Sequence, residues 1–296
     1  MKILSFGSLN IDYTYSVEHI VQKGETLSST SLEVFSGGKG LNQSIALAKA
    51  GAEVYMAGAV GKDGLFLLDL LKENNVNIEY TKVLDTIRTG NAIIQKDIHG
   101  ENCILLYGGA NQAIEKDYID EVLNHFNDQD YLIIQNEINN LDYLVVKASQ
   151  KGLKVILNPS PMNEKILALP LDKINYFILN EVEVCQILNE EYKDNGKELA
   201  YKMLEKYPDS HIILTLGSKG SIYIDQKNFY KQGIYKVQAV DTTAAGDTFS
   251  GYFFASILNG KGIPYALDLA AKASSIAVTR LGAAPSIPLK EEVEAC

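Results

Sequence analysis

Cysteine and histidine are scarce in this chain, and their positions exclude the sites that they most often build. The 296 residues include three cysteines, Cys103, Cys185 and Cys296, which are widely spaced and form no CxxC pair. An odd number of cysteines at such spacing argues against a disulfide framework and against a zinc site. The four histidines are equally scattered, so we interpret them as ordinary surface or core residues.

The chain also lacks runs of basic residues and long apolar segments. Its formal net charge is −10 and its pI is near 5.0, so a nucleic acid partner is not expected. No segment approaches the roughly 18 uninterrupted apolar residues of a membrane-spanning helix. The N-terminus reads as a short strand entering a turn rather than a secretion signal. We therefore expect a cytoplasmic protein without membrane contact.

What the sequence does contain is the regular alternation of a layered α/β protein. Apolar runs rich in β-branched residues, at 3–6 and 54–60, precede segments of helical period at 41–50 and 65–72. The same alternation resumes in four later runs, each followed by a candidate helix; they are 131–134, 155–157, 176–179 and 212–216. This pattern predicts a parallel sheet covered by helices on both faces, in one domain spanning residues 1–296.

Two stretches, residues 13–35 and 89–107, break this rhythm. Polar and apolar residues alternate there with period two, and the connections are short, which predicts antiparallel ribbons outside the main sheet. A ribbon with one apolar face has to bury that face on a ligand, a partner subunit or the body of the domain. We therefore expect a small β lid rather than a second domain.

The most distinctive local signal is DTTAAGDTF at 241–249, where small residues lead directly into a predicted helix at 245–258. The first turn of a helix exposes unpaired N–H groups and the positive end of the dipole, so it can bind an anion. The residues of this turn are Ala244, Ala245, Gly246 and Asp247. A carboxylate at an anion site suits a general base, although Asp247 alone is equally explained as an acidic residue that complements the dipole.

A glycine-rich turn, SGGKGLNQ at 36–43, opens the predicted helix at 41–50. It is not a Walker A loop, because that motif needs four residues between its glycines and a hydroxyl after the lysine. No GxGxxG follows the first strand either, so the usual dinucleotide fingerprint is missing. The turn brings Lys39 and Asn42 close to a polar group, or else it is a packing turn.

Asn10 and Asp12 follow the first predicted strand, at the edge where open α/β sheets bind ligands. Two residues apart in an extended segment, they point the same way and offer donors and acceptors for vicinal hydroxyls. Turn chemistry explains the pair equally well when it is considered in isolation.

Taken in this order, these segments resemble the ribokinase branch of the PfkB family of sugar kinases. The resemblance runs the whole chain, and the segment around Asp247 is its most family-specific part. The other matching segments are GSLNID at 7–12, GET at 24–26, GGKGLNQ at 37–43, VGKDG at 60–64, TG at 89–90, GAN at 109–111, NP at 158–159, NEVE at 180–183, TLGSKG at 215–220 and AVTRLGAAPS at 277–286.

The resemblance implies a ribokinase-like three-layer α/β/α sandwich with a central, mostly parallel sheet and a small β lid that often doubles as a homodimer interface. It implies that the γ-phosphoryl group of ATP is transferred to a sugar hydroxyl, with Asp247 as base and the N–H groups of residues 245–247 as anion hole. The sugar hydroxyls would be held by Asn10, Asp12, Gly38, Lys39, Asn42 and Glu137. Asn180 and Glu183 would lie near the phosphates and Mg²⁺, and the nucleotide site would be lined by Thr215, Gly217 and Gly220.

The family also binds a monovalent cation such as K⁺ beside the anion hole. The positions that match its site are Asp241, Thr243, Ala277, Arg280, Gly282 and Ser286. Most of them would contribute backbone carbonyls, so Asp241 is the informative one.

The predicted lid departs from the resemblance at Asn91 and Gln95, where we expect apolar residues. Whether either amide faces the sugar depends on strand register, because a slip of one residue exchanges the two faces. The leading hypothesis is phosphorylation of D-ribose to ribose 5-phosphate. The alternatives are another sugar or a nucleoside as substrate, for example pseudouridine, deoxyribose or fructose, and a non-catalytic sugar-binding sensor.

Overall fold

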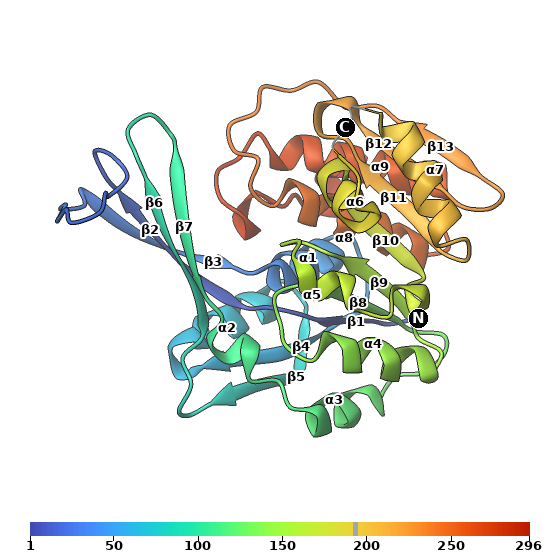
Figure 1. Ribbon diagram of the computed structural model, residues 1–296, viewed down its shortest axis with the longest axis horizontal. Helices are drawn as coiled ribbons and strands as arrows, with labels where there is room; N and C mark the ends of the chain where they lie inside the picture. Colours follow the sequence, from blue (N-terminus) through green and yellow to red (C-terminus); the bar gives the residue numbers. More distant parts are fainter. Residues whose placement is uncertain (192–194) are drawn as a thin grey trace.

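The computed structural model describes residues 1–191 and 195–296, and a large central sheet organises this part of the chain (Figure 1). Its strand order is β13-β12-β11-β10-β9-β8-β1-β4-β5, and the strands from β11 to β5 pair in parallel. The strands are β1 (Ile3–Phe6), β4 (Val54–Gly61), β5 (Asn77–Leu84), β8 (Tyr131–Gln135), β9 (Lys154–Asn158), β10 (Tyr176–Asn180), β11 (His211–Thr215), β12 (Ser221–Ile224) and β13 (Phe229–Gln232).

Helices cover both faces of this sheet, because successive apolar residues of a strand point to opposite faces. In β8, Leu132 and Ile134 join one hydrophobic core while Ile133 joins the other. The first core is covered by α3 (Lys116–Leu123), α4 (Leu141–Gln150), α5 (Glu164–Leu167), α6 (Glu181–Leu188) and α7 (Gly196–Lys206). The second is covered by α1 (Lys39–Lys49), α2 (Leu65–Glu73), α8 (Ala245–Leu258), α9 (Ile263–Ala277) and α10 (Lys290–Glu294). The predicted three-layer architecture is confirmed.

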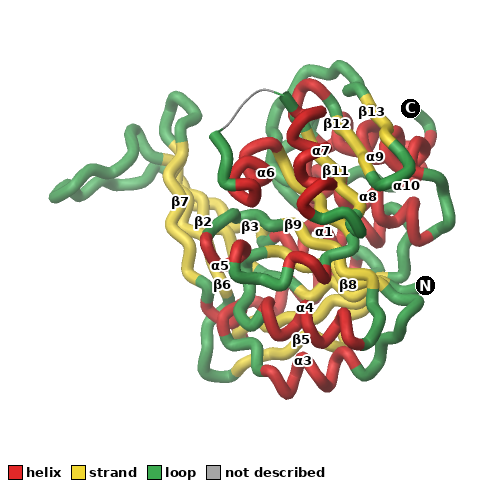
Figure 2. The backbone as a smooth tube through the Cα atoms, turned by 45° about the vertical axis from the view of Figure 1, so that its right-hand side comes forward, coloured by secondary structure: helices red, strands yellow, loops and turns green. Residues whose placement is uncertain are grey.

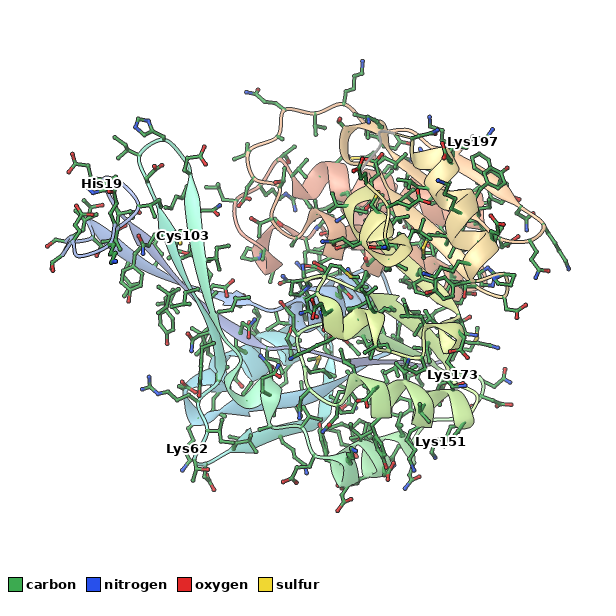
Figure 3. All side chains as sticks on the ribbon, viewed as in Figure 1. His19, Lys62, Cys103, Lys151, Lys173 and Lys197 are labelled. Atoms are coloured by element: carbon green, nitrogen blue, oxygen red, sulfur yellow. The ribbon has the colours of Figure 1, made fainter. Side chains whose placement is uncertain are left out.

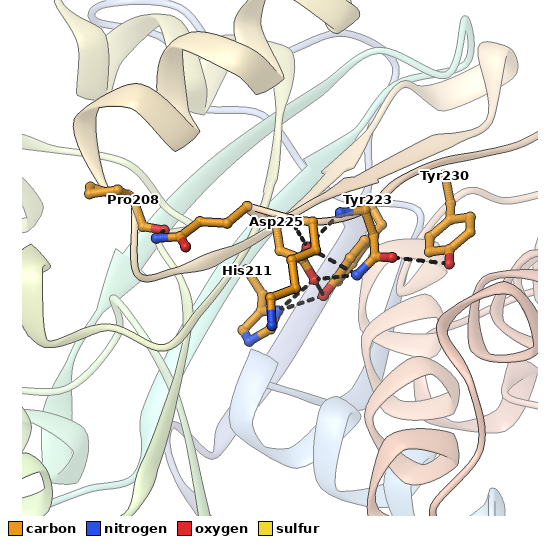
Figure 4. A network of polar contacts seen from close by, with 8 residues as sticks. Pro208, His211, Tyr223, Asp225 and Tyr230 are labelled. Atoms are coloured by element: carbon orange, nitrogen blue, oxygen red, sulfur yellow. Dashed lines mark hydrogen bonds and ion pairs between the residues drawn. The ribbon is translucent and has the colours of Figure 1, made fainter.

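The expectation of a helix after residues 212–216 is wrong. The chain instead turns back into β12 and β13, which pair antiparallel and form one edge of the sheet. Figure 4 shows the polar network that holds this hairpin: the Tyr223 hydroxyl donates to Asp225 Oδ2 at 2.7 Å and contacts His211 Nδ1 at 2.5 Å. Asp225 Oδ1 accepts the N–H of Asn228 at 2.8 Å, which closes the turn. This local hydrogen bonding favours a hairpin over a helix.

The two predicted ribbons form one separate sheet that projects from the body (Figures 1 and 2). Its strands are β2 (Asn10–Ser16), β3 (Ser31–Gly37), β6 (Gly90–Lys96) and β7 (Asn102–Tyr107), in the order β3-β2-β6-β7. Each ribbon is antiparallel, and the two join through a parallel pairing of β2 with β6. We call this sheet the lid.

The base of the lid is fixed to the body through Thr89. Its N–H and hydroxyl donate to Asp63 Oδ1 at 3.0 and 2.8 Å, and its hydroxyl accepts the N–H of Gly61 at 2.9 Å. Cys103 is exposed on the lid, far from the body (Figure 3), and all three cysteines are unpaired. No helix in residues 1–191 and 195–296 is long and apolar enough to cross a membrane.

Candidate active site

A cavity of ≈ 240 Å³ lies at the carboxyl ends of the parallel strands, against the first turn of α8. Open α/β sheets bind ligands at this edge. The predicted site residues that line the cavity are Lys39, Asn180, Glu183, Thr215, Ala244, Ala245, Gly246 and Asp247. Asn158, Ser160 and Thr242 also line it, and sequence reasoning gave them no role.

Asp247 is 7% exposed and lies where the cavity meets α1. Asn42 Nδ2 donates to its Oδ2 at 3.2 Å, and Gln43 Nε2 donates to its Oδ1 at 2.9 Å. The other polar atom of the Asn42 amide, Oδ1, is buried without a hydrogen-bond partner among the described residues. Since buried acceptors rarely stay unpaired, Asn42 Oδ1 is suited to accept a ligand hydroxyl.

The start of α8 presents N–H groups to the cavity. Ala244 has a left-handed backbone with φ 57°, which turns the chain sharply into the helix. The N–H groups of Gly246 and Asp247 make no hydrogen bond within the described part of the chain. The N–H of Ala245, also predicted to bind the anion, donates instead to the Thr242 carbonyl at 3.2 Å. Two of the three predicted donors are therefore available to an anion.

Glu137 follows the end of β8 after one intervening residue and faces the glycine-rich turn. Its Oε2 accepts the N–H of Lys39 at 2.9 Å and the hydroxyl of Ser8. The turn needs glycine at position 38, because its φ is 95° and a Cβ there would lie 2.8 Å from the Ser8 carbonyl oxygen. The chain thus places Lys39 and Glu137 side by side at the inner end of the lid.

Asn10 and Asp12 both lie on β2 and share one face of the lid, as predicted. The Asn10 Oδ1 atom accepts Asn111 Nδ2 at 2.7 Å, which leaves the Asn10 Nδ2 group to donate elsewhere. Asn111 also holds the Leu9 backbone, accepting its N–H at 3.0 Å. Sequence reasoning missed this supporting role, although the GAN segment at 109–111 marked the position.

Burial, together with the nearby charge of Glu137, raises the pKa of Asp12 from 3.8 to about 6. Keeping this carboxylate ionised at neutral pH costs the fold about 3 kcal/mol, because each pKa unit corresponds to about 1.4 kcal/mol. A carboxylate that the fold holds at such a cost is suited to a ligand that donates hydrogen bonds to it.

The strand register determines which lid residues share the face of Asp12. In the parallel pairing of β2 with β6, Asp12 is opposite Ala92 and Thr14 is opposite Ile94. Asn91 and Gln95 therefore point to the other face. There Gln95 Oε1 accepts the N–H of Val21 at 2.9 Å. Of the β6 residues that share the Asp12 face, Ala92 and Ile94 are apolar, and Lys96 lies farther along the strand, opposite Ser16.

The opposite end of the cavity is formed by Asn180 and Glu183. They make a capping box in which Asn180 Oδ1 accepts the N–H of Glu183 and Glu183 Oε2 accepts the N–H of Asn180, both at 2.9 Å. Burial raises the pKa of Glu183. Beyond Thr215, Gly217 and Gly220 form a tight turn, with φ 54° and 93°. A Cβ at Gly220 would lie 2.0 Å from the Gln232 carbonyl oxygen, so this turn depends on glycine.

The predicted cation-binding positions flank the first turn of α8. Asp241 Oδ1 accepts the N–H of Thr243 at 2.9 Å, and its Oδ2 accepts the N–H of Gly282 at 3.0 Å. Burial opposes ionisation of Asp241, but these hydrogen bonds outweigh it and lower its pKa. The Arg280 side chain pairs with Glu292 instead, and its Nη2 donates to Glu292 Oε1 at 2.5 Å. Ala277 is the last residue of α9, and the buried Ser286 closes the segment with a hydrogen bond to Ala283.

The chain is similar to known proteins over nearly its whole length. Residues 1–290 match the family model described as pfkB family carbohydrate kinase. The chain is 33% identical over 307 residues to a ribokinase of Staphylococcus aureus, covering 99% of this chain and 98% of the relative. It is 35% identical over 314 residues to a ribokinase of Schizosaccharomyces pombe, covering 99% and 97%. A solved Arabidopsis thaliana ribokinase complexed with ribose and ATP has a TM-score of 0.86 at 28% identity, covering 99% and 97%.

Proposed function

The chain belongs to the pfkB family of carbohydrate kinases and is an ATP-dependent carbohydrate kinase, and on this basis we propose that it phosphorylates D-ribose to ribose 5-phosphate. One observation supports D-ribose over a nucleoside or a larger polyol as the substrate. On the lid face shared with Asp12, the β6 residues opposite Asp12 and Thr14 are the apolar Ala92 and Ile94, while Asn91 and Gln95 point away. A nucleobase or a larger polyol needs an additional polar contact, and neither lid amide supplies it.

Within this proposal, the sugar lies between the lid and α1. Asn10 Nδ2 donates to one hydroxyl, Asp12 accepts from another, and Asn42 Oδ1 supplies a further acceptor. Asp247 accepts the proton of the attacking primary hydroxyl as general base. Lys39 and the N–H groups of Gly246 and Asp247 stabilise the charge that develops on the transferred phosphoryl group.

The residues at the far end of the cavity fit Mg²⁺ and the phosphates of ATP. Glu183 is buried at the cavity, and burial raises its pKa, so a bound cation would compensate the cost of its charge. Carboxylate oxygens with retained waters are the ligands that Mg²⁺ prefers. Bound Mg²⁺ would neutralise charge on the phosphates. Asn180 and Glu183 would hold it, and Thr215 with the turn at Gly217 and Gly220 would border the nucleotide.

ADP release from Mg-ATP on addition of sugar tests this proposal against a sugar-binding sensor, which would bind ribose without turnover. A panel of ribose, deoxyribose, fructose and pseudouridine in the same assay identifies the substrate. The proposal includes a cytoplasmic location, where ATP is abundant and where unpaired cysteines such as the three of this chain are usual.

We propose that K⁺ binds at the segment formed by Asp241, Gly282 and their neighbours, and that it stimulates turnover. The Asp241 carboxylate already accepts the N–H groups of Thr243 and Gly282. A cation bound there would therefore act by fixing the backbone beside the first turn of α8. Its effect is expected on kcat rather than on the KM for sugar. Initial rates in potassium, sodium and choline buffers of equal ionic strength test this. Equal kcat values in all three would refute it.

We also propose a homodimer formed through the lid face that points away from Asp12. The apolar side chains of this face are between 39% and 66% exposed; they are Leu32, Val34, Ile93, Leu105 and Tyr107. Contiguous apolar exposure of this kind is typical of an interface. Sedimentation is expected to give a dimer for the wild type and a monomer for Leu105→Asp. Leu167→Asp, at an exposed apolar residue on α5, is the matched control and is expected to stay dimeric. A monomeric wild type at high micromolar concentration contradicts the proposal.

A further inference from the structure

Two fully buried glutamines connect the catalytic carboxylate to the centre of the sheet. Gln43 on α1 and Gln135 at the end of β8 are both 0% exposed. Gln43 Nε2 donates to Asp247 Oδ1 at 2.9 Å, and Gln135 Nε2 donates to Gln43 Oε1 at 2.8 Å. The chain of contacts therefore runs from β8 through α1 to α8, across residues that are 92 and 204 positions apart in the sequence.

The carboxylate fixes the direction of both amides. An ionised carboxylate only accepts hydrogen bonds, so Gln43 has to turn its NH₂ group toward Asp247 and its oxygen toward Gln135. Gln135 then has to present its own NH₂ group to Gln43. Its oxygen is left buried without a partner among the described residues, in the space beside Gly7, where a Cβ would lie 2.3 Å from it. Leaving the Gln135 oxygen without a hydrogen bond is unfavourable, and this loss accompanies the orientation of both amide NH₂ groups toward Asp247.

Close packing of α1 against α8 holds this arrangement in place. A Cβ at Gly251 would lie 2.3 Å from the Cβ of Ala46, so the two helices approach at the distance that only glycine allows. Gln43 approaches Oδ1 from the fully buried side. Asn42, whose second amide atom is free for a ligand, approaches Oδ2.

We propose that Gln43, oriented by Gln135, is a positioning residue that holds Asp247 Oδ1 and leaves Oδ2 as the oxygen that takes the proton from the sugar hydroxyl. This inference rests on the proposed function, in which Asp247 is the base. The proton passes from the hydroxyl to Oδ2, and the sugar oxygen bonds to the phosphorus as the bond to the ADP oxygen breaks. Gln43 exchanges no proton, and its contribution is orientation.

Gln43→Met removes the donor while keeping nearly the same volume. It is expected to lower kcat about 10- to 100-fold, with the KM values for sugar and ATP within about threefold, because a misplaced base costs turnover and not ground-state binding. Gln135→Leu is expected to have a smaller effect of the same kind. In the double variant the two losses should not add, because both act through one contact.

The pH profile tests whether position 43 contacts the base in the working enzyme, and the split between kcat and KM in Gln43→Met distinguishes positioning from a merely structural role. Gln43→Glu places a second carboxylate beside Asp247, so the acid limb of the kcat profile is expected to move to higher pH. Among the described residues that line the cavity, the other charged side chains are Lys39 and Glu183, which stay the same in every variant. Ser44→Ala, which also removes a buried polar group of α1, is the matched control, since its hydroxyl bonds to Gly40 and Met56 and to no other described residue. It is expected to keep wild-type kcat and pH dependence.

All variants are assayed with the sugar that the wild type phosphorylates best, after thermal unfolding has confirmed that they are folded. Should Gln43→Met fail to fold, Gln135→Leu and Gln43→Glu carry the test. A folded Gln43→Met enzyme with kcat within twofold of wild type, or an unchanged acid limb in Gln43→Glu, overturns the inference. A wild type that phosphorylates no sugar overturns the proposed function instead, so the two failures are distinguishable.

Discussion

Asp247→Asn is expected to lower kcat by about 10²- to 10⁴-fold, because an amide keeps the shape of the side chain but cannot accept the proton of the attacking hydroxyl. Sugar and ATP affinities are expected to change little, since neither depends on proton transfer. Steady-state kinetics with isothermal titration of each ligand measures both quantities.

The structure supplies a suitable control for this replacement. Asp268 is a carboxylate on the neighbouring helix α9, and it bonds to Tyr235 and Lys272 at the surface. Asp268→Asn is expected to keep wild-type turnover. An Asp247→Asn enzyme that retains more than half of wild-type kcat would refute the role of Asp247 as base, whatever its affinity for ligands.

The parallel core of the fold was predictable because its strands are buried on both faces. The run at 131–134, for example, corresponds to β8 within one residue. Strand β5 was missed because it lies at the edge of the sheet and mixes exposed polar with half-buried apolar residues. The hairpin of β12 and β13 was missed because β12 has only four residues. The periodicity of such a short apolar run does not distinguish a strand from a segment of a buried helix.

The site was predictable where one short segment carries several functional groups. The turn at 36–43 and the segment at 241–249 both lie at the cavity, and their residue types indicated a polar group and an anion. The supporting residues could not be predicted in this way, because their partners are far away in the sequence. Asn111, for example, meets Asn10 across 101 positions. The one available signal for Gln135 was a polar residue that ends an otherwise apolar strand.

The second large effect concerns the sugar: D-ribose is expected to exceed 2-deoxyribose in kcat/KM by up to about 10⁴-fold. A site built around hydroxyl partners rejects an analogue that lacks one, because the protein group is left buried and unpaired. Asp12 is the group that the missing hydroxyl would leave unpaired, since it is partly buried and its charge is already costly to the fold. A kcat/KM for pseudouridine or any hexose above that for ribose would refute the ribose assignment and leave the kinase assignment intact.

Asp12→Ala is expected to lower kcat/KM for ribose selectively and so to narrow the gap between the two sugars. Glu101→Ala, which removes an exposed carboxylate from the β6–β7 connection of the lid, is expected to leave the gap unchanged.

The pH dependence of kcat/KM provides an independent check on the role of Asp12. The pKa of Asp12 is about 6, so the carboxylate is ionised above pH 6 and loses acceptor capacity as the pH falls through that value. Wild-type kcat/KM for ribose should therefore fall below pH 6, while deoxyribose should not show this decline, because it lacks the hydroxyl that Asp12 holds. An identical decline for both sugars, persisting in Asp12→Ala, would assign the titration to another group and remove Asp12 from the basis of selectivity.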